Sequence, residues 1–276
     1  MFYRKPDLRS AAILSILAVS VGMTACSSDD DDGGILGELP DGELPEEIVD
    51  AEIPDGELPD VEDIFDPDAP APEGSYTITF TNTSDSQPMT PPVVALHNPP
   101  TGDNGIRFFE VGQPAIGEVV AIAEDGNNAP LVGVVTGQIA AGTISDGGPA
   151  FPDPANPGPL VPGAVASITL TPSDDTQVLS FVSMVVCTND GFSGADSIPL
   201  EEGSFLANIY DAGSETNVID LDYWVPPCGS EDNITDDEGG AITAHPGQAS
   251  ESPDLATAPF DFPAGTQLLQ VDIIAN

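Results

Sequence analysis

Two short acidic segments hold the residues whose types and spacing could bind a cation. "CTNDGFSGADS" (Cys187–Ser197) reads as a loop after an apolar run, and "NIYDAGSETN" (Asn208–Asn217) carries Asp211 and Glu215 on either side of an Ala-Gly turn. Ca²⁺ prefers about six to eight carboxylate and carbonyl oxygens, and glycine lets the backbone fold so that such oxygens converge. A chain with 47 acidic residues also contains many solvated turns. Residue types alone therefore leave both interpretations open.

The sequence offers little for catalysis. Its two histidines are His97 and His245. A zinc site needs about three or four nitrogen or sulfur ligands at close spacing, and "GFSGA" lacks the last glycine of the G-x-S-x-G nucleophile motif. We therefore expect no enzyme and no catalytic residues; a periplasmic hydrolase that uses either histidine is a less favoured alternative.

Charge excludes one class of partner. The chain has 4 basic and 47 acidic residues, a formal net charge of −43. Binding to nucleic acid requires basic patches that contact phosphates, so we expect no nucleic-acid partner. Three of the bases, Arg4, Lys5 and Arg9, precede the apolar run "SAAILSILAVSVGMTAC". A basic start, an apolar centre and a small-residue end are typical of a secretory signal peptide.

The end of this signal, "MTAC", resembles the lipobox of bacterial lipoproteins. On that interpretation residues 1–25 are a lipoprotein signal peptide and Cys26 is the lipid-attachment residue; simple cleavage beside an incidental cysteine is the alternative. Lipid chains hold a protein at a membrane by burying methylene groups, so the membrane is an expected partner. Because Ser27 rather than an aspartate follows Cys26, we expect an outer-membrane lipoprotein of the cell envelope, on the periplasmic face or the cell surface.

Residues 26–74 are predicted to form a disordered tether. The segment is acidic and rich in proline and glycine, and "PDGELP" occurs at Pro40–Pro45 and again at Pro54–Pro59. The segment can bury too little apolar surface to offset the conformational entropy that it would lose on folding. A Ca²⁺-binding repeat is the alternative, but the carboxylates lack the spacing of an EF-hand loop.

Residues 75–276 have the alternating pattern of β-strands. We predict an all-β fold, an antiparallel β-sandwich of about eight strands, with one short helix at Ile116–Gly126 and a long surface loop at Ser145–Gly163. Cys187 and Cys228 can form a disulfide in an oxidising compartment, or remain as two thiols. The expected strands are Tyr76–Asn82, Pro92–His97, Leu131–Gly137, Ala164–Thr171, Val178–Cys187, Ser204–Tyr210, Asn217–Tyr223 and Gln267–Ile274.

Four blocks within residues 75–276 together resemble the spondin N-terminal domain, the module of F-spondin and mindin. They are "TPPVVALHNP" (Thr90–Pro99), "FFEVGQPAIGEVVAIAEDGN" (Phe108–Asn127), "SMVVCTNDGFSGADSIPL" (Ser183–Leu200) and "NIYDAGSETN" (Asn208–Asn217), in the family's order and spacing. The resemblance implies a β-sandwich similar to a C2 domain, with Ca²⁺ bound at one end. It also implies adhesion or binding rather than catalysis.

The resemblance also assigns the metal ligands. The aspartate of the family's Asp-Trp pair falls on Asp190, and the acids of its Asp-Ala-Gly-Thr-Asp motif fall on Asp211 and Glu215. Gly191 stands where the family has tryptophan, and Glu215 stands where it has aspartate. The expected function is a lipid-anchored envelope binding module with a Ca²⁺ cofactor and an unidentified protein or glycan ligand. A structural envelope lipoprotein without a specific ligand is the alternative.

Overall fold

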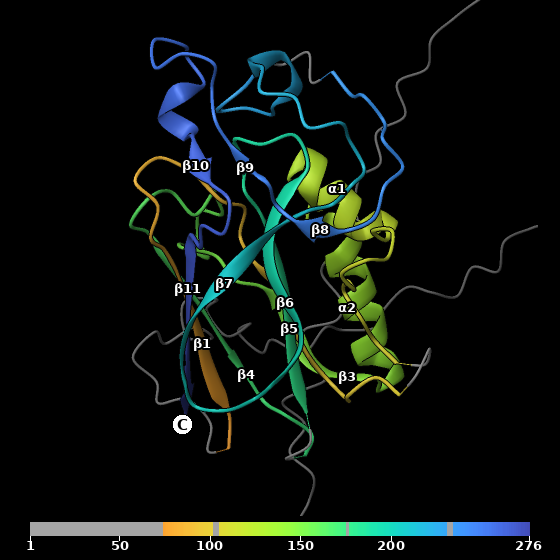
Figure 1. Ribbon diagram of the computed structural model, residues 1–276. Coiled ribbons are helices and arrows are strands. Elements are labelled where there is room, and N and C mark those ends of the chain that lie inside the picture. Colours follow the sequence, from red (N-terminus) through yellow and green to blue (C-terminus); the bar gives the residue numbers. More distant parts are fainter. Residues whose placement is uncertain (1–73, 102–104, 175–176, 231–233) are drawn as a thin grey trace, which may run out of the picture. The chain divides into compact units, whose positions relative to one another are not determined.

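Antiparallel β-structure dominates the computed structural model, which describes residues 74–101, 105–174, 177–230 and 234–276. The predicted signal peptide, Cys26 and almost all of the predicted tether lie outside these residues. The described chain contains two α-helices, α1 and α2, and strands β1 to β11 (Figure 1). The bounds are β1 Tyr76–Asn82, β2 Val93–His97, α1 Gly117–Asp125, α2 Ala129–Ala141, β3 Ile144–Pro149, β4 Val165–Leu170, β5 Val178–Met184, β6 Gly191–Pro199, β7 Gly203–Asp211, β8 Thr243–Ala244, β9 Gly247–Gln248, β10 Phe262–Pro263 and β11 Leu269–Ala275.

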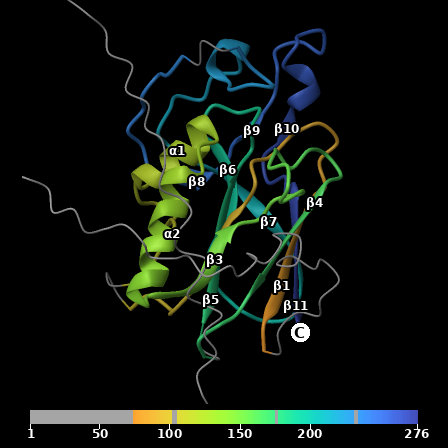
Figure 2. The ribbon, with the colours of Figure 1, turned by 180° about the vertical axis from the view of Figure 1, so that it is seen from behind.

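Nine of these strands form one sheet. Its order is β3-β2-β5-β6-β7-β11-β1-β4, with β8 added to β7, while β9 and β10 pair separately. All of the ladders are antiparallel. Both views show the strands β3, β5 and β6 beside the helices, and β1, β4 and β11 on the other side (Figures 1 and 2). The expectation of an all-β, antiparallel fold is confirmed at this level.

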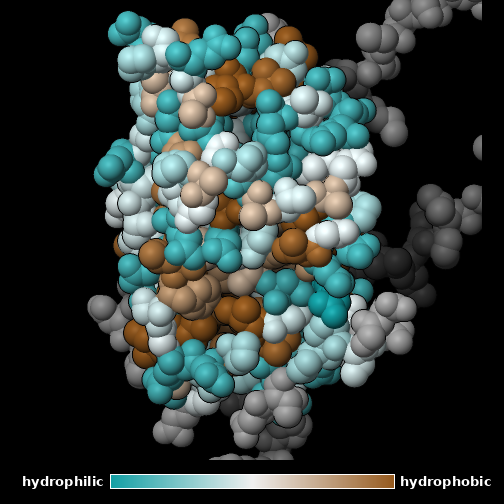
Figure 3. Space-filling model, in the orientation of Figure 1, coloured by the Kyte–Doolittle hydropathy of each residue, from teal (hydrophilic) through white to brown (hydrophobic). Residues whose placement is uncertain are grey.

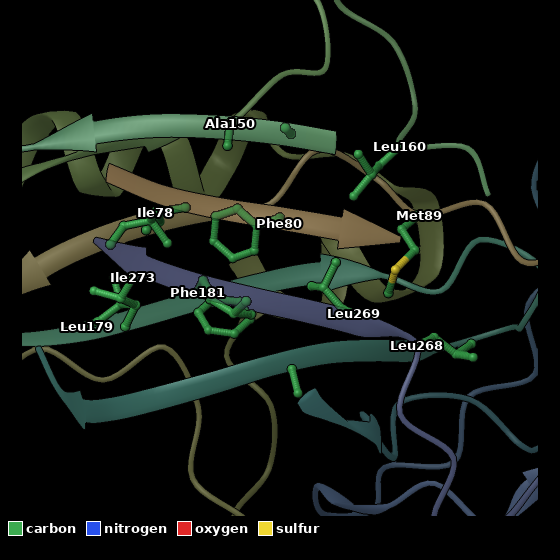
Figure 4. Packing of buried hydrophobic residues seen from close by; sticks show 14 of the residues in the cluster. Ile78, Phe80, Met89, Ala150, Leu160, Leu179, Phe181, Leu268, Leu269 and Ile273 are labelled. Carbon is green, nitrogen blue, oxygen red and sulfur yellow. The ribbon is translucent and has the colours of Figure 1, made fainter. Parts of the chain in front are cut away.

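The main hydrophobic core lies between the two halves of this sheet. Phe80 of β1 meets Phe181 of β5 edge to face, with ring centroids 5.1 Å apart. Leu269 and Ile273 of β11 lie in the same cluster, on either side of Phe181 in the view of Figure 4. Burial of side chains of this size stabilises a fold by about 1.5–3 kcal/mol each, so this cluster holds the strands that contribute to it together.

A second core forms where the helices cover the outer face of the β2–β5–β6 half. Val119 and Ile122 of α1 and Leu131 and Val135 of α2 are buried there together with apolar residues of β2 and β5. Within the described residues, no helix is long and apolar enough to cross a membrane.

Helix α2 corrects the prediction of a strand at Leu131–Gly137 and of a single helix. The β-branched residues of "LVGVV" suggested a strand, but Leu131 and Val135 are one helical turn apart and bury a common face. Pro130 in the first turn and a left-handed Gly142 (φ 75°) at the C-terminus suit the helix ends. The helical spacing of Leu131 and Val135 cannot be recognised in the sequence, because the residues next to them are also apolar.

Two further assignments differ. Residues 217–223, predicted as a strand, form no strand and end in a short 3₁₀ turn at Leu221–Tyr223. The predicted loop Ser145–Gly163 contributes β3, which pairs with β2, and Leu160 from the same segment is fully buried. Glycine and proline in "SDGGPAFPDP" suggested a loop, yet Gly147 is needed in the strand, since a Cβ there would lie 2.5 Å from Val94 O.

A disulfide joins Cys187, after β5, to Cys228, with Cα atoms 5.3 Å apart and a sequence separation of 41. Closing a loop of this length stabilises a fold by about 4 kcal/mol in chain-entropy treatments. We therefore expect reduction to lower the free energy of unfolding by about 2–4 kcal/mol, measured by urea unfolding with and without a phosphine reductant. A Cys187→Ala/Cys228→Ala variant should show the same loss and no further response to the reductant. An unchanged urea midpoint after reduction would contradict this expectation.

Candidate metal centre

The turn between β5 and β6 places Asp190 at the start of the candidate site. Thr188 shapes this turn: its Oγ1 donates to Val185 O at 2.7 Å and accepts from Gly191 N at 2.9 Å. Strand β6 begins at Gly191, so Phe192 and Ser193 are buried in a strand. The prediction that the whole segment Cys187–Ser197 is a loop is therefore wrong; the loop is the turn that ends at Asp190.

Steric contact with Thr188 explains why position 191 of this turn is a glycine. A Cβ at this position would lie 2.5 Å from Thr188 Oγ1 and 3.1 Å from Thr188 Cβ. Position 191 is therefore closed to a side chain in this structure unless the turn moves, because Thr188 occupies the space that the side chain would need.

Asp190 is fully buried, and its two carboxylate oxygens differ. Oδ2 accepts hydrogen bonds from the backbone N–H groups of Ser214 and Glu215, each at 3.0 Å, while Oδ1 has no hydrogen-bond partner. Burial raises the pKa of Asp190 to about 6 against these hydrogen bonds, and the charge of Asp211 adds to the rise. A buried carboxylate oxygen without a hydrogen-bond partner raises the free energy of the folded state. A positive charge or a proton bound at Asp190 Oδ1 would offset this penalty.

Asp211 ends β7 directly across the ladder from Gly191. Its Oδ1 accepts from Gly213 N at 2.7 Å, and its Oδ2 accepts from the side-chain amide of Asn217. Gly213 is required here, because its φ is +65° and a Cβ would lie 2.7 Å from Ala241 O. The Asp-Ala-Gly sequence thus makes a tight turn that holds the Asp211 carboxylate beside the loop that Asp190 binds.

Glu215 is also buried, at 2% exposure. Burial raises its pKa to about 8, and Glu124, Asp190, Asp125 and Asp237 raise it further through their charges. Burial also raises the pKa of Glu124, which lies at the end of α1 and whose carboxylate is hydrogen-bonded to the Ser214 side chain. The structure therefore brings the three predicted residues, Asp190, Asp211 and Glu215, into one group of interacting carboxylates.

Glu124, Asp125 and Asp237 also belong to this group, and the sequence motifs did not assign them as ligands. Glu124 belongs to the "AEDG" that closes the second block of the spondin resemblance, and that motif could have identified it. Asp237 comes from a segment that no motif covers; its backbone pairs with Glu215 in an isolated bridge. Only the folded chain places Asp237 next to the site.

The donor set fits a hard cation, although the described residues do not form a finished cage. No group of three or more His, Cys, Asp or Glu side chains in the described ranges is arranged to hold a metal ion. The chemistry still matches: buried carboxylates with raised pKa values and a free Asp190 Oδ1 are suited to Ca²⁺, which binds oxygen in a flexible geometry. The fit therefore rests on the oxygen donors and on the unpartnered atom.

The two histidines have structural surroundings. His97 Nδ1 donates to Asn98 O at 2.9 Å, and its Nε2 lies 2.7 Å from the hydroxyl oxygen of Ser180, which also lies 3.2 Å from Asp196 Oδ1. Both side chains are fully buried in adjacent strands, so no substrate reaches this pair in this structure. His245 packs on Phe262 with ring centres 5.0 Å apart, and its Nε2 has no hydrogen-bond partner. Burial lowers the pKa of both histidines.

The raised pKa of Glu215 gives a pH dependence. A folded-state pKa near 8 against an unfolded value of 4.5 means that the folded protein binds the extra proton, so this stability is present at low pH and is lost as the pH rises toward 8. In EDTA we expect Glu215→Gln to be more stable than the parent chain at pH 8.5, with an advantage of roughly 1.4 kcal/mol per pKa unit shifted, but not at pH 4. Urea unfolding measures this difference.

The exposed Glu251 provides the control. Glu251→Gln removes the same charge at a residue that is not among those whose charges act on Asp190 or Glu215, so it should shift stability little and equally at both pH values. Equal pH profiles for Glu215→Gln and Glu251→Gln would show that Glu215 ionises normally and would remove the electrostatic basis of the site.

Comparisons with known proteins assign no family to this chain. No family model matches it, and a search of curated proteins returns no relative. The spondin resemblance therefore remains a proposal that rests on the four sequence blocks.

Proposed function

We propose that this chain is a non-catalytic binding module of the cell envelope whose domain is stabilised by Ca²⁺ at one end of the sheet. The observation that carries the proposal is the fully buried Asp190, whose Oδ1 has no hydrogen-bond partner beside a second buried carboxylate, Glu215. In a chain with a net charge of −43, such a pair is unfavourable without a compensating cation. Ca²⁺ supplies that charge.

Asp190, Asp211 and Glu215 are the proposed ligands, and Glu124 is added to them because its carboxylate shares Ser214 with Asp190. The bound ion supplies positive charge and oxygen coordination. The chain's own contribution is positioning: the N–H groups of Ser214 and Glu215 fix Asp190 Oδ2, and the Gly213 turn fixes Asp211. This arrangement joins the β5–β6 turn, the end of β7 and the end of α1.

We take the sheet to be a β-sandwich similar to a C2 domain, with one layer formed by β3, β2, β5 and β6 and the other by β7, β11, β1 and β4. The supporting observation is that the buried faces of β1, β2, β5 and β11 meet in one cluster. The spondin resemblance implies the same architecture.

Anchoring completes the proposed function. We assign the lipid to Cys26 and the location to the outer membrane, on the periplasmic face or the cell surface, with the acidic segment 26–74 as the tether. These assignments rest on the lipobox-like "MTAC" and on composition. A structural envelope protein with no ligand besides the ion is the second candidate. A hydrolase is disfavoured by the burial of His97 and Ser180.

Calcium titration tests the proposal. We expect CaCl₂ added to the EDTA-treated full chain to raise the melting temperature well beyond NaCl of equal ionic strength, because specific coordination adds to charge screening. Asp190→Asn and Asp211→Asn should each weaken Ca²⁺ binding by at least about tenfold in calorimetric titration. Asp272→Asn, in β11 and not among the proposed ligands, is the control and should bind Ca²⁺ as the parent chain does. Equal responses to CaCl₂ and NaCl in every variant would refute the metal site.

A further inference from the structure

Strands β6 and β7 separate partway along their length and leave an opening in the sheet. Their ladder runs only from Gly191↔Asp211 to Gly194↔Asn208. Beyond Gly194, β6 pairs with β5 alone, and the first half of β7 (Gly203–Ala207) pairs with β11 alone. Each strand therefore has an edge, facing the other, that no described strand occupies.

Local contacts hold this opening apart. In β6 the register against β5 shifts at Ser180, whose Oγ accepts Ser197 N at 2.8 Å, and Ser197 takes a left-handed conformation (φ 56°). Asp196 Oδ1 accepts Phe108 N at 2.6 Å. The link between the strands is tied to the far end of β11, where Ala275 N donates to Glu202. Both edges are thus fixed by their own neighbours, so the opening is built into the fold.

The opening between β6 and β7 forms a groove on the surface. Two adjoining cavities of about 390 and 340 Å³ share Ile198 and Phe205 as lining residues. Both of these side chains also pack against the main core, so the floor of the groove is apolar. On the molecular surface, apolar residues gather in the lower left of the face, over the opening between β6 and β7 (Figure 3). An apolar floor between two strand edges is suited to an extended peptide.

The alternation of backbone groups shows which part of β7 faces the groove. Ala212 N donates to Asp190 O on the β6 side, and Asn208 O accepts Ser193 Oγ there, whereas Ile209 O accepts His245 N on the opposite edge. In an antiparallel strand the N–H and C=O of one residue point to the same side and alternate along the chain. Leu206 and Ser204 therefore present their backbone groups to the groove. Leu206 O also accepts the Gln267 side chain at 2.9 Å.

Charge selects the occupant. Four acids, Glu110, Asp196, Glu201 and Glu202, line the groove against one base, Arg107. Arg107 lies 3.6 Å from Glu110 and 3.7 Å from Asp196, so its charge is already paired. A second copy of this chain, or its own acidic segment 26–74, would be repelled by this lining. A peptide with lysine or arginine would be attracted to it.

We infer that the groove between β6 and β7 binds an extended, basic peptide segment of a partner protein by adding it as a strand to the free edge of β7. About five residues of peptide, at roughly 3.4 Å each, would cover Gly203–Ala207. Alternate side chains would lie on Ile198 and Phe205, and basic residues would meet the acidic rim. The inference rests on the proposed binding function but uses none of the proposed Ca²⁺ ligands.

A random seven-residue peptide library displayed on phage and selected on the full chain tests the inference. We expect enriched peptides to combine lysine or arginine with alternating β-branched or aromatic residues. Synthetic copies should bind at least tenfold more weakly to Leu206→Pro, which removes one groove-facing N–H while the ladder to β11 uses the neighbouring residues. No enrichment, or equal binding to the variant, would overturn the inference.

Two charge variants keep the test decisive if Leu206→Pro fails to fold. Glu110→Lys/Glu201→Lys reverses two exposed acids of the rim and should weaken binding of the selected peptides at least tenfold at low salt. Glu251→Lys/Asp254→Lys makes the same change of net charge at exposed residues outside the groove and should leave binding nearly unchanged. Equal losses in both would reduce the effect to net charge and overturn the site.

Calcium titration of the same variants separates this inference from the proposed function. The groove variants should bind Ca²⁺ as the parent chain does, and selected peptides should still bind a folded Asp190→Asn chain. Loss of peptide binding only in the groove variants supports the inference even if Ca²⁺ binding fails. Binding of a glycan panel that depends on Leu206, with no peptide enriched, would assign the groove to carbohydrate and overturn the peptide assignment.

Discussion

The short ladder between β6 and β7 is the constraint on which the rest of the structure depends. Its four residue pairs are the connection, by strand pairing, between the half of the sheet that carries the helices and the half that contains β1, β4 and β11. Phe192 and Tyr210 face each other across it, and Phe109 packs on both, with ring centroids 5.1 and 5.0 Å away. Such aromatic contacts add about 0.5–1.5 kcal/mol each beyond burial. They stabilise the ladder next to the point where the strands separate.

The cluster of buried carboxylates at one end of this ladder, formed by Asp190, Asp211 and Glu215, has an electrostatic cost that hydrogen bonding does not remove. Two backbone donors serve Asp190 Oδ2, yet Oδ1 has none, and burial still raises the pKa of both Asp190 and Glu215. A solvated turn would leave these groups exposed and ionised. Their burial therefore argues against the alternative that these segments are solvated turns, and it favours either proton uptake or a bound cation.

The sequence could predict the elements with a clear period and the residues with a motif. Tyr76–Asn82 alternates inward and outward side chains and forms β1 with the predicted bounds. Helix α2 was missed because its buried Leu131 and Val135 stand among other apolar residues. The motifs predicted Asp190, Asp211 and Glu215 as ligands, and the structure places these three carboxylates together, but Asp237 joins them through long-range pairing with Glu215. The separation of β6 from β7 follows from tertiary contacts at Ser180 and Asp196, which no local pattern encodes.

The two candidate sites use different parts of β7, and this placement has a mechanical consequence. Asp211 ends the strand beside the other buried carboxylates, while the groove is lined by Gly203–Asn208 and by Tyr210. The ladder ends at Gly194, where a Cβ would lie 2.6 Å from Phe181 O and 3.1 Å from the Phe109 ring. A cation that fixes Asp190 to the end of β7 would hold the closed part of the ladder in register. The divergence beyond Gly194 is set instead by β5 and β11, so ion binding and peptide binding should be largely independent.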